Sequence, residues 1–176
     1  ALIRVDKKTR GLLLKMAHQE GFKGKSEQSF LFQSHGKVPC DRVVLVGLGA
    51  KADYKPEVAR LAMGRVVKML SKYKAKSVAI QIPITPVLDD TLRAIVEGCG
   101  LGAYKYERWK TGNQDDRKSP KLDKVQLCLP DGEKKTKAME HSVAFAKKVF
   151  AATNWARDLV NEPAGTMSPT HLADEA

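Results

Sequence analysis

The sequence lacks the features that mark membrane-spanning or secreted proteins. No segment approaches the roughly 18 uncharged apolar residues of a membrane span. Residues 1–7 are too few and too charged for a secretory signal. The cysteines, Cys40, Cys99 and Cys128, are odd in number, widely spaced and set in apolar surroundings. We therefore expect a cytoplasmic protein with buried, reduced thiols.

Motifs of known catalytic chemistry are also missing. There is no His-Glu-x-x-His, no Cys-x-x-Cys and no Gly-x-Ser-x-Gly. We interpret all four histidines as surface residues: His18, His35, His141 and His171. Neighbouring side chains in the pairs Asp89–Asp90 and Asp115–Asp116 point apart, which favours capping or solvated loops over a shared site. The sequence therefore assigns no catalytic, metal-binding or cofactor-binding residue.

Acidic residues are too few to balance the bases. The chain has 31 Lys and Arg against 20 Asp and Glu, a net charge of +11. Residues 151–176 hold one base and four acids, so the first 150 residues carry +14. The bases concentrate in residues 65–76 and 134–148, without aromatic interleaving of the kind that stacks nucleic-acid bases. This balance fits either a solvated surface or non-specific nucleic-acid binding.

Apolar periodicity predicts alternating strands and helices. We expect helices over residues 7–18, 56–74, 89–99 and 135–160, and strands over residues 29–33, 42–48, 77–82 and 124–129. The β-branched run at 42–48 is typical of a strand covered on both faces. The alternation predicts the α/β class, as a three-layer α/β/α domain around a mostly parallel central sheet. We expect residues 42–48 and 77–82 in one sheet.

Three glycine-containing segments lie between or within the predicted helices and strands. Gly98, Gly100 and Gly102 are expected to interrupt the helical pattern, and residues 111–121 to form an exposed loop. Gly47-Leu-Gly-Ala-Lys-Ala52 matches Gly-x-Gly-x-x-Ala after a strand, a turn that can bind a pyrophosphate. No acidic residue follows about 20 positions later, so a tight strand-to-helix turn is the favoured interpretation.

The carboxyl-terminal residues resemble a domain junction. Residues 156–163 read Ala-Arg-Asp-Leu-Val-Asn-Glu-Pro, and Ser168-Pro169 then supplies a helix cap and first-turn residue. This segment is similar to the junction that joins the two domains of M17 leucyl aminopeptidases. Weaker similarities lie at residues 22–25, 43–49 and 98–109. Gly165 stands where the family usually has Asn.

The resemblance implies an amino-terminal domain over residues 1–162 and a junction over residues 163–176 that leads to a catalytic domain. The family's metal ligands and its Asn-Thr-Asp-Ala-Glu-Gly-Arg signature have no counterpart in this sequence. The implied parent binds two divalent ions, zinc or manganese, removes amino-terminal residues from peptides and assembles as a hexamer. We expect the 176 residues alone to be inactive, and residues after Pro163 to be poorly anchored.

Two readings of the chain's own role stay open. Arg157, Asp158 and Asn161 end a long helix, where they could tie down the junction or remain surface residues. The family's domain is also similar in architecture to macro domains, which bind ADP-ribose. The Gly47–Gly49 turn and the basic body could serve ADP-ribose or a nucleic acid, an alternative of a different class.

Overall fold

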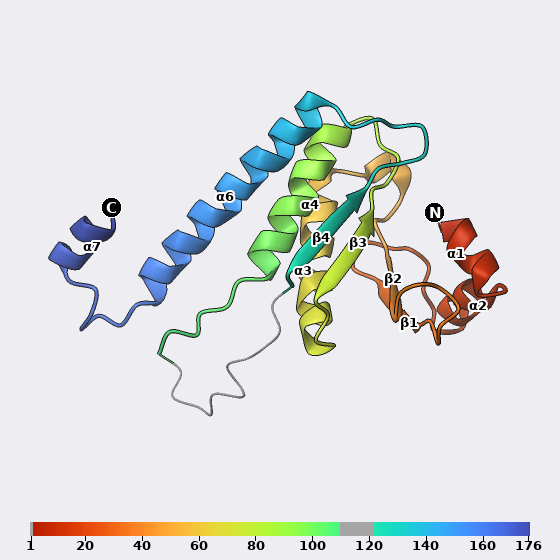
Figure 1. Cartoon of the computed structure of the whole chain (residues 1–176), viewed down its shortest axis with the longest axis horizontal. Coiled ribbons are helices and arrows are strands. Elements are labelled where there is room, and N and C mark those ends of the chain that lie inside the picture. The colour runs from red at the N-terminus through yellow and green to blue at the C-terminus, as the bar shows by residue number, and fades with distance from the viewer. Residues whose placement is uncertain (1, 110–121) are drawn as a thin grey trace.

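The computed structural model describes residues 2–109 and 122–176 as a mixed α/β fold (Figure 1). The helices are α1 (Leu2–Lys8), α2 (Leu12–Gln19), α3 (Pro56–Lys72), α4 (Leu88–Gly102), α6 (Lys137–Asn161) and α7 (Pro169–Glu175), with a 3₁₀ turn at Lys51–Asp53. The strands are β1 (Ser29–Gln33), β2 (Arg42–Val46), β3 (Ser77–Gln81) and β4 (Lys124–Cys128). The predicted α/β class and the main elements are confirmed. The expected loop at residues 111–121 lies outside the described residues.

The four strands form two hydrogen-bonded pairs. β1 and β2 are antiparallel, with Ser29 opposite Val46, because the short connection 34–41 reverses the chain. β3 and β4 are parallel, with Ser77 opposite Lys124, because helix α4 and the segment after it return the chain to the same end. The expectation that residues 42–48 and 77–82 share one sheet was wrong, since β2 and β3 lie in separate pairs.

Strand β2 separates two apolar clusters. Val43 and Leu45 pack against α1, α2 and β1 in the smaller cluster, built on Leu13, Ala17, Phe30 and Phe32. Val44 and Val46 pack against the larger cluster on α3 and α4. Helices therefore cover both faces of the β1–β2 pair, as predicted for this strand. The larger cluster comprises Ala59, Ala62, Met63, Val66, Val67, Leu70, Ile82, Leu92, Ile95, Cys99 and Met139.

The predicted helix at residues 7–18 is in fact two helices. Arg10 and Gly11 have φ of 55° and 76°, in the left-handed region that ends a helix. The buried Thr9 hydroxyl accepts a hydrogen bond from the Leu13 amide at 3.3 Å, and an Asp6 carboxylate oxygen accepts one from Leu14 at 3.0 Å. These side chains cap the start of α2 and stabilise the break.

Gly98 and Gly100 lie inside helix α4 and do not interrupt it, contrary to the prediction, whereas Gly102 is its last residue. A Cβ on Gly98 would lie 2.2 Å from the Arg60 carbonyl oxygen on α3. One on Gly100 would lie 2.3 Å from the Phe150 ring on α6, and one on Gly102 would lie 2.7 Å from the Cα of Gly64. The glycines therefore permit α4 to approach α3 on one side and α6 on the other (Figure 1).

Helix α6 extends past the body of the molecule. It has 25 residues, and both of its ends lie within two positions of the predicted range 135–160. Of these residues, only Met139 and Ala146 are buried. Val160, near its end, is 84% exposed. Figure 1 shows α7 beyond this end, away from both strand pairs. The predicted cap of α7 is confirmed, because Ser168 Oγ accepts a hydrogen bond from the His171 amide at 3.2 Å. The domain boundary after residue 162 stays a prediction.

No helix among the described residues is long and apolar enough to cross a bilayer.

We predict that Gly98→Ala destabilises the protein. Its Cβ would meet backbone atoms that cannot rotate away, so the free energy of unfolding should fall by about 2 kcal/mol or more. Gly64→Ala is the matched control in the same helix pair, since its Cβ would meet only the Gly98 carbonyl oxygen at 3.7 Å. The control should be neutral or up to about 1 kcal/mol more stable, because alanine favours the helix. Urea unfolding measures both, and equal midpoints would contradict the packing argument.

Candidate functional site

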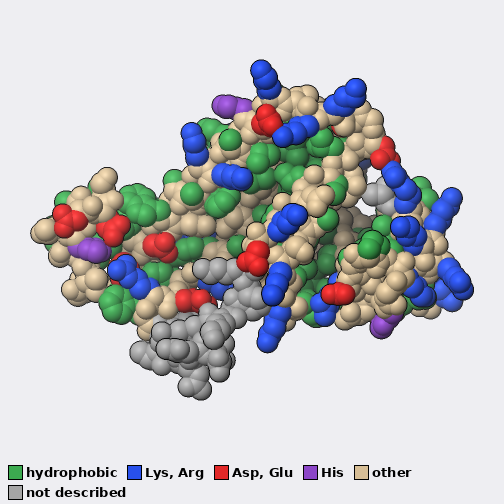
Figure 2. Space-filling model, viewed as in Figure 1, with side chains coloured by type: hydrophobic (Ala, Val, Ile, Leu, Met, Phe, Trp, Pro, Cys, Tyr) green, Lys and Arg blue, Asp and Glu red, His purple; other side chains and the backbone are tan. Residues whose placement is uncertain are grey.

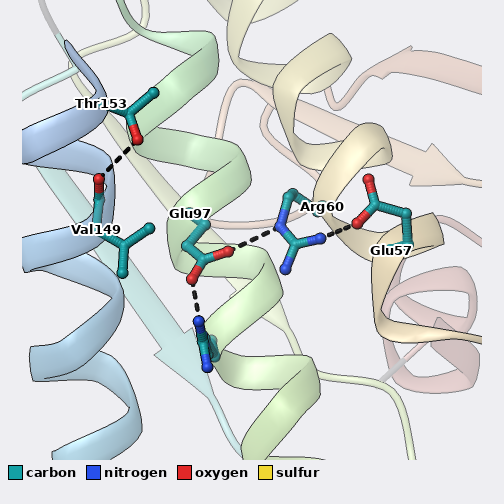
Figure 3. Close-up of polar contacts among 6 residues, drawn as sticks. Glu57, Arg60, Glu97, Val149 and Thr153 are labelled. Carbon is teal, nitrogen blue, oxygen red and sulfur yellow. Dashed lines mark hydrogen bonds and ion pairs between the residues drawn. The ribbon is translucent and has the colours of Figure 1, made fainter. Parts of the chain in front are cut away.

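A buried carboxylate lies where the three long helices meet. The Glu97 side chain on α4 is 5% exposed, and its two oxygens accept hydrogen bonds from Arg60 Nε on α3 and Arg93 Nε, each at 2.8 Å. Arg60 also pairs with Glu57 (Figure 3). Arg93 in turn lies over the Phe145 ring of α6, 4.4 Å from its centroid. The network thus connects α3, α4 and α6, with the buried charge fully paired.

We predict that Glu97→Gln lowers the free energy of unfolding by about 1–3 kcal/mol, because two arginines lose a charged acceptor at a buried position. Glu57→Gln is the control within the same network. Its side chain is 54% exposed, so its loss should cost at most about 1 kcal/mol. Chemical denaturation measures both variants. A larger loss for Glu57→Gln than for Glu97→Gln would contradict this assignment.

A second polar constellation joins the end of α6 to the end of α4. Asn154 Nδ2 donates to the Gly100 carbonyl at 3.1 Å, and an Arg157 guanidinium nitrogen donates to the Leu101 carbonyl at 3.2 Å. These carbonyls belong to the last turn of α4, where no further turn of helix supplies a donor. The predicted tie at the junction is therefore present, and Arg157 stabilises the end of the neighbouring helix.

The same end of α6 also holds the segment that follows α4. Tyr104 donates its hydroxyl proton to Asp158 Oδ1 at 2.9 Å and accepts a hydrogen bond from Asn161 Nδ2 at 3.0 Å. Arg157 lies over the Tyr104 ring, 5.3 Å from its centroid. All three residues singled out from the sequence at this helix end therefore contact Tyr104. Asp158 and Asn161 are nevertheless exposed and Arg157 is half-buried, so the three residues lie at the surface and are paired there.

Glu162 closes this constellation at the last position before Pro163. Its side chain is 2% exposed, and it accepts hydrogen bonds from Trp109 Nε1 at 2.9 Å and from Arg108. Burial alone raises the pKa of Glu162, but the contacts with Trp109, Tyr106 and Arg108 outweigh burial and hold the pKa below its ordinary value. The charged carboxylate is therefore the form that fixes the 104–109 segment to α6.

A shallow hollow of about 310 Å³ lies beside this constellation, between the 105–108 segment, the end of α6 and α7. Its wall mixes bases, acids and an aromatic ring, including Lys105, Arg108, Trp155, Asp158, Glu162 and His171. Asp158 and Glu162 already accept hydrogen bonds from Tyr104, Trp109 and Arg108. The arrangement positions chain segments relative to one another, and we call residues Tyr104, Trp109, Asn154, Arg157, Asp158, Asn161 and Glu162 the junction brace.

The other residues considered from the sequence are not brought together. His18, His35 and His141 are exposed as predicted, while His171 is half-buried with Nε2 at 4.0 Å from Glu175. Asp89 and Asp90 occupy the first turn of α4, where negative charge is favourable. Asp115 and Asp116 lie outside the described residues. Within residues 2–109 and 122–176, no group of three or more His, Cys, Asp or Glu side chains is placed to hold a metal ion.

The cysteines match the expectation only in part. All three are free, and burial raises the pKa of the Cys99 thiol to about 11. Cys128 is half-buried. The expectation that Cys40 is buried was wrong, because its side chain is exposed in the connection between β1 and β2.

The glycine turn after β2 has little capacity to bind a phosphate. The amides of Gly47 and Gly49 donate to the carbonyls of Gln28 and Gly24 at 2.9 and 3.0 Å. A Cβ on Gly47 would lie 2.0 Å from the Lys25 carbonyl oxygen, so this glycine serves close packing of two segments. Helix α3 begins only at Pro56, and its amino terminus does not follow the turn directly. The geometry supports the tight-turn interpretation.

We predict that the Glu162 carboxylate of the junction brace takes up a proton at acid pH. Because the folded-state pKa of Glu162 is lowered, its contribution is present above the ordinary value of 4.5 and is lost as pH falls through the lower value. Trp109 emission, measured in a Trp155→Phe background between pH 6 and 3, should change with a midpoint below 4.5. Glu162→Gln should abolish that step. A midpoint above 4.5, or the same step in the variant, would contradict the assignment.

Comparison with known proteins identifies the family. Residues 1–113 match the N-terminal domain of the cytosol aminopeptidase family. A "Probable cytosol aminopeptidase" of Alkaliphilus oremlandii (strain OhILAs) is 32% identical over 177 residues, which cover 98% of this chain and 34% of that protein. One of Geobacter sp. (strain M21) is 32% identical over 167 residues, covering 94% of this chain and 33% of that protein. The chain belongs to the cytosol aminopeptidase family.

Solved structures agree with this assignment. A mutant of tomato leucine aminopeptidase superposes with a TM-score of 0.80 and 26% identity, covering 97% of this chain and 32% of that one. The bottromycin maturation enzyme BotP, in complex with Mn, superposes with a TM-score of 0.72 and 25% identity, covering 90% of this chain and 31% of that one. The chain therefore spans about a third of the length of the relatives that it matches.

Proposed function

We propose that these residues form the non-catalytic amino-terminal domain of a two-metal leucyl aminopeptidase, and that the domain supports the catalytic domain and the assembly of the enzyme. The observation that carries the proposal is the end of α6, where a polar brace fixes the helix from one side while apolar side chains remain uncovered. Trp155, Val160 and Leu172 are 44%, 84% and 46% exposed. A partner domain that packs on α6 and α7 would cover such side chains.

The junction brace gives the domain a mechanical role in this proposal. Arg157 and Asn154 hold α6 to the end of α4, and Glu162 holds the last residue before Pro163 to Arg108 and Trp109. The direction in which the chain leaves the domain is therefore set by paired side chains. We infer that this direction determines how the catalytic domain sits on α6.

The parent's chemistry is proposed from the relatives. Their names state aminopeptidase, and one solved neighbour is described with Mn. Because the described residues offer no matching set of ligands, we place the two divalent ions, zinc or manganese, in the catalytic domain of the parent. In this proposal peptide substrates bind in that catalytic domain, and the parent assembles as a hexamer. A cytoplasmic location is in keeping with the word cytosol in the relatives' names.

We predict that residues 1–176 do not cleave leucine p-nitroanilide with added Mn²⁺ or Zn²⁺. A chimera in which this chain replaces the matching third of the Alkaliphilus oremlandii relative should cleave it in a metal-dependent manner. The release of p-nitroaniline, followed by its absorbance, measures both activities. Metal-dependent cleavage by residues 1–176 alone, at a rate comparable with the chimera, would overturn the proposal.

The chimera also tests the uncovered face of α6. Val160→Glu should leave the melting temperature of residues 1–176 unchanged, because the side chain is 84% exposed there, yet should lower the chimera's activity and its assembled fraction at least tenfold. Leu61→Glu on α3 is the control, with an apolar side chain that is 56% exposed on another helix. Equal effects of the two substitutions, or none, would contradict a docking role for α6.

A further inference from the structure

The outer face of helix α3 carries bases that no nearby acid in the sequence offsets. Residues 58–88 contain no Asp or Glu. Arg65, Lys68 and Lys72 are exposed at spacings of three and four residues, so they share one face of α3. Lys74 and Lys76 follow directly and are also exposed. We call these five residues the basic ridge.

The fold adds two cations to the ridge from distant parts of the sequence. The Arg42 guanidinium of β2 lies over the ring of Tyr73, 4.9 Å from its centroid, between Lys72 and Lys74 in the sequence. Lys124 of β4 donates its amide to the Lys76 carbonyl at 3.2 Å, which places it next to the far end of the ridge. Two acids, Asp41 and Asp123, adjoin these added residues. The cations therefore outnumber the acids along the whole feature.

Within the described structure, ion pairs hold some cations of the helical body, but none of the ridge side chains. Arg60 and Arg93 are held by Glu97, and Lys135 pairs with Glu140. Among the described residues, no ion pair involves any of the five ridge side chains. Nε of Arg42 is buried and has no hydrogen-bond acceptor in the described part of the chain. The ridge thus keeps its charge available to an external anion.

Helix stability explains only part of this arrangement. Bases in the last turn of a helix offset its dipole, which accounts for Lys72 and for Lys74 just beyond it. Arg65 and Lys68 lie one to two turns further in, where the dipole effect has faded. The second lysine-rich segment, residues 134–148, includes Glu140 and its ion pair with Lys135. The ridge is therefore the stronger candidate for an anion-binding surface.

We propose that the basic ridge binds the phosphate backbone of a nucleic acid without reading its sequence. Arg65 and Lys72 are separated by seven residues, a rise of about 10 Å along the helix. A duplex presents about six phosphate charges over that length, so a linear row of bases matches a linear row of anions. The apolar face of α3 is buried in the core, which leaves the ridge to contact phosphates from outside. Figure 2 shows Lys and Arg spread over this face of the body, with several Asp and Glu side chains at the α7 end and others scattered among the bases.

A titration with a 20-base-pair duplex tests the proposal, using the 176-residue chain and fluorescence anisotropy at 50 and 200 mM NaCl. The test variant combines Arg65→Gln, Lys68→Gln, Lys72→Gln and Lys76→Gln. Glutamine keeps the helix, and Lys74 is left in place because its φ of 54° tolerates few residues. The control removes the same charge elsewhere through Lys134→Gln, Lys137→Gln, Lys147→Gln and Lys148→Gln, all exposed.

The wild-type chain should bind at 50 mM NaCl and weaken steeply at 200 mM. The ridge variant should lose at least tenfold in affinity, and its salt slope should fall by about 3.6 units, roughly 0.9 for each of the four lost phosphate contacts. The control should change less than threefold. Equal losses in both variants, absence of binding by the wild-type chain, or binding to anionic phosphatidylserine vesicles with none to the duplex would each overturn the proposal. Circular dichroism melts establish that both variants are folded.

Discussion

The close approach of α3, α4 and α6 is the constraint on which the rest of the structure depends. Gly98 and Gly102 bring α4 against the backbone of α3, and Gly100 brings α4 against Phe150 of α6. At that distance Glu97 can accept from Arg60 on α3, and Asn154 of α6 can reach the Gly100 carbonyl. Two of the bonds of the junction brace end on the last turn of α4. These two bonds therefore form only because the helices touch.

The sequence predicted those parts of the fold that depend on local periodicity. The amphipathic pattern of residues 56–74 became α3, and the cap at Ser168 formed as expected, because both signals involve residues within a few positions of each other. The same local view failed at Gly98 and Gly100. A glycine in a helix reads as a break when its neighbours in space are unknown, whereas here they are a backbone carbonyl and an aromatic ring.

The sequence likewise predicted some residues of the candidate site but not their partners. Arg157, Asp158 and Asn161 were recognised because they precede Pro163 at a helix end, but their partner Tyr104 lies more than 50 residues away. Glu97 carried one local signal, an Arg four residues earlier, and this spacing is common on exposed helices. Nothing local shows that Glu97 is buried. Pairing of Glu162 with Trp109 likewise depends on the tertiary approach of two segments.

The central claim is that the end of α6 and α7 form the surface on which a catalytic domain packs. Amide hydrogen exchange of residues 150–176 tests this most directly, compared between the isolated chain and the chimera with the Alkaliphilus oremlandii relative. The account predicts that amides near Val160 and Leu172 exchange markedly more slowly in the chimera, because the partner domain excludes water from side chains that are 84% and 46% exposed in the chain alone. Identical exchange of this segment in the two proteins would contradict it.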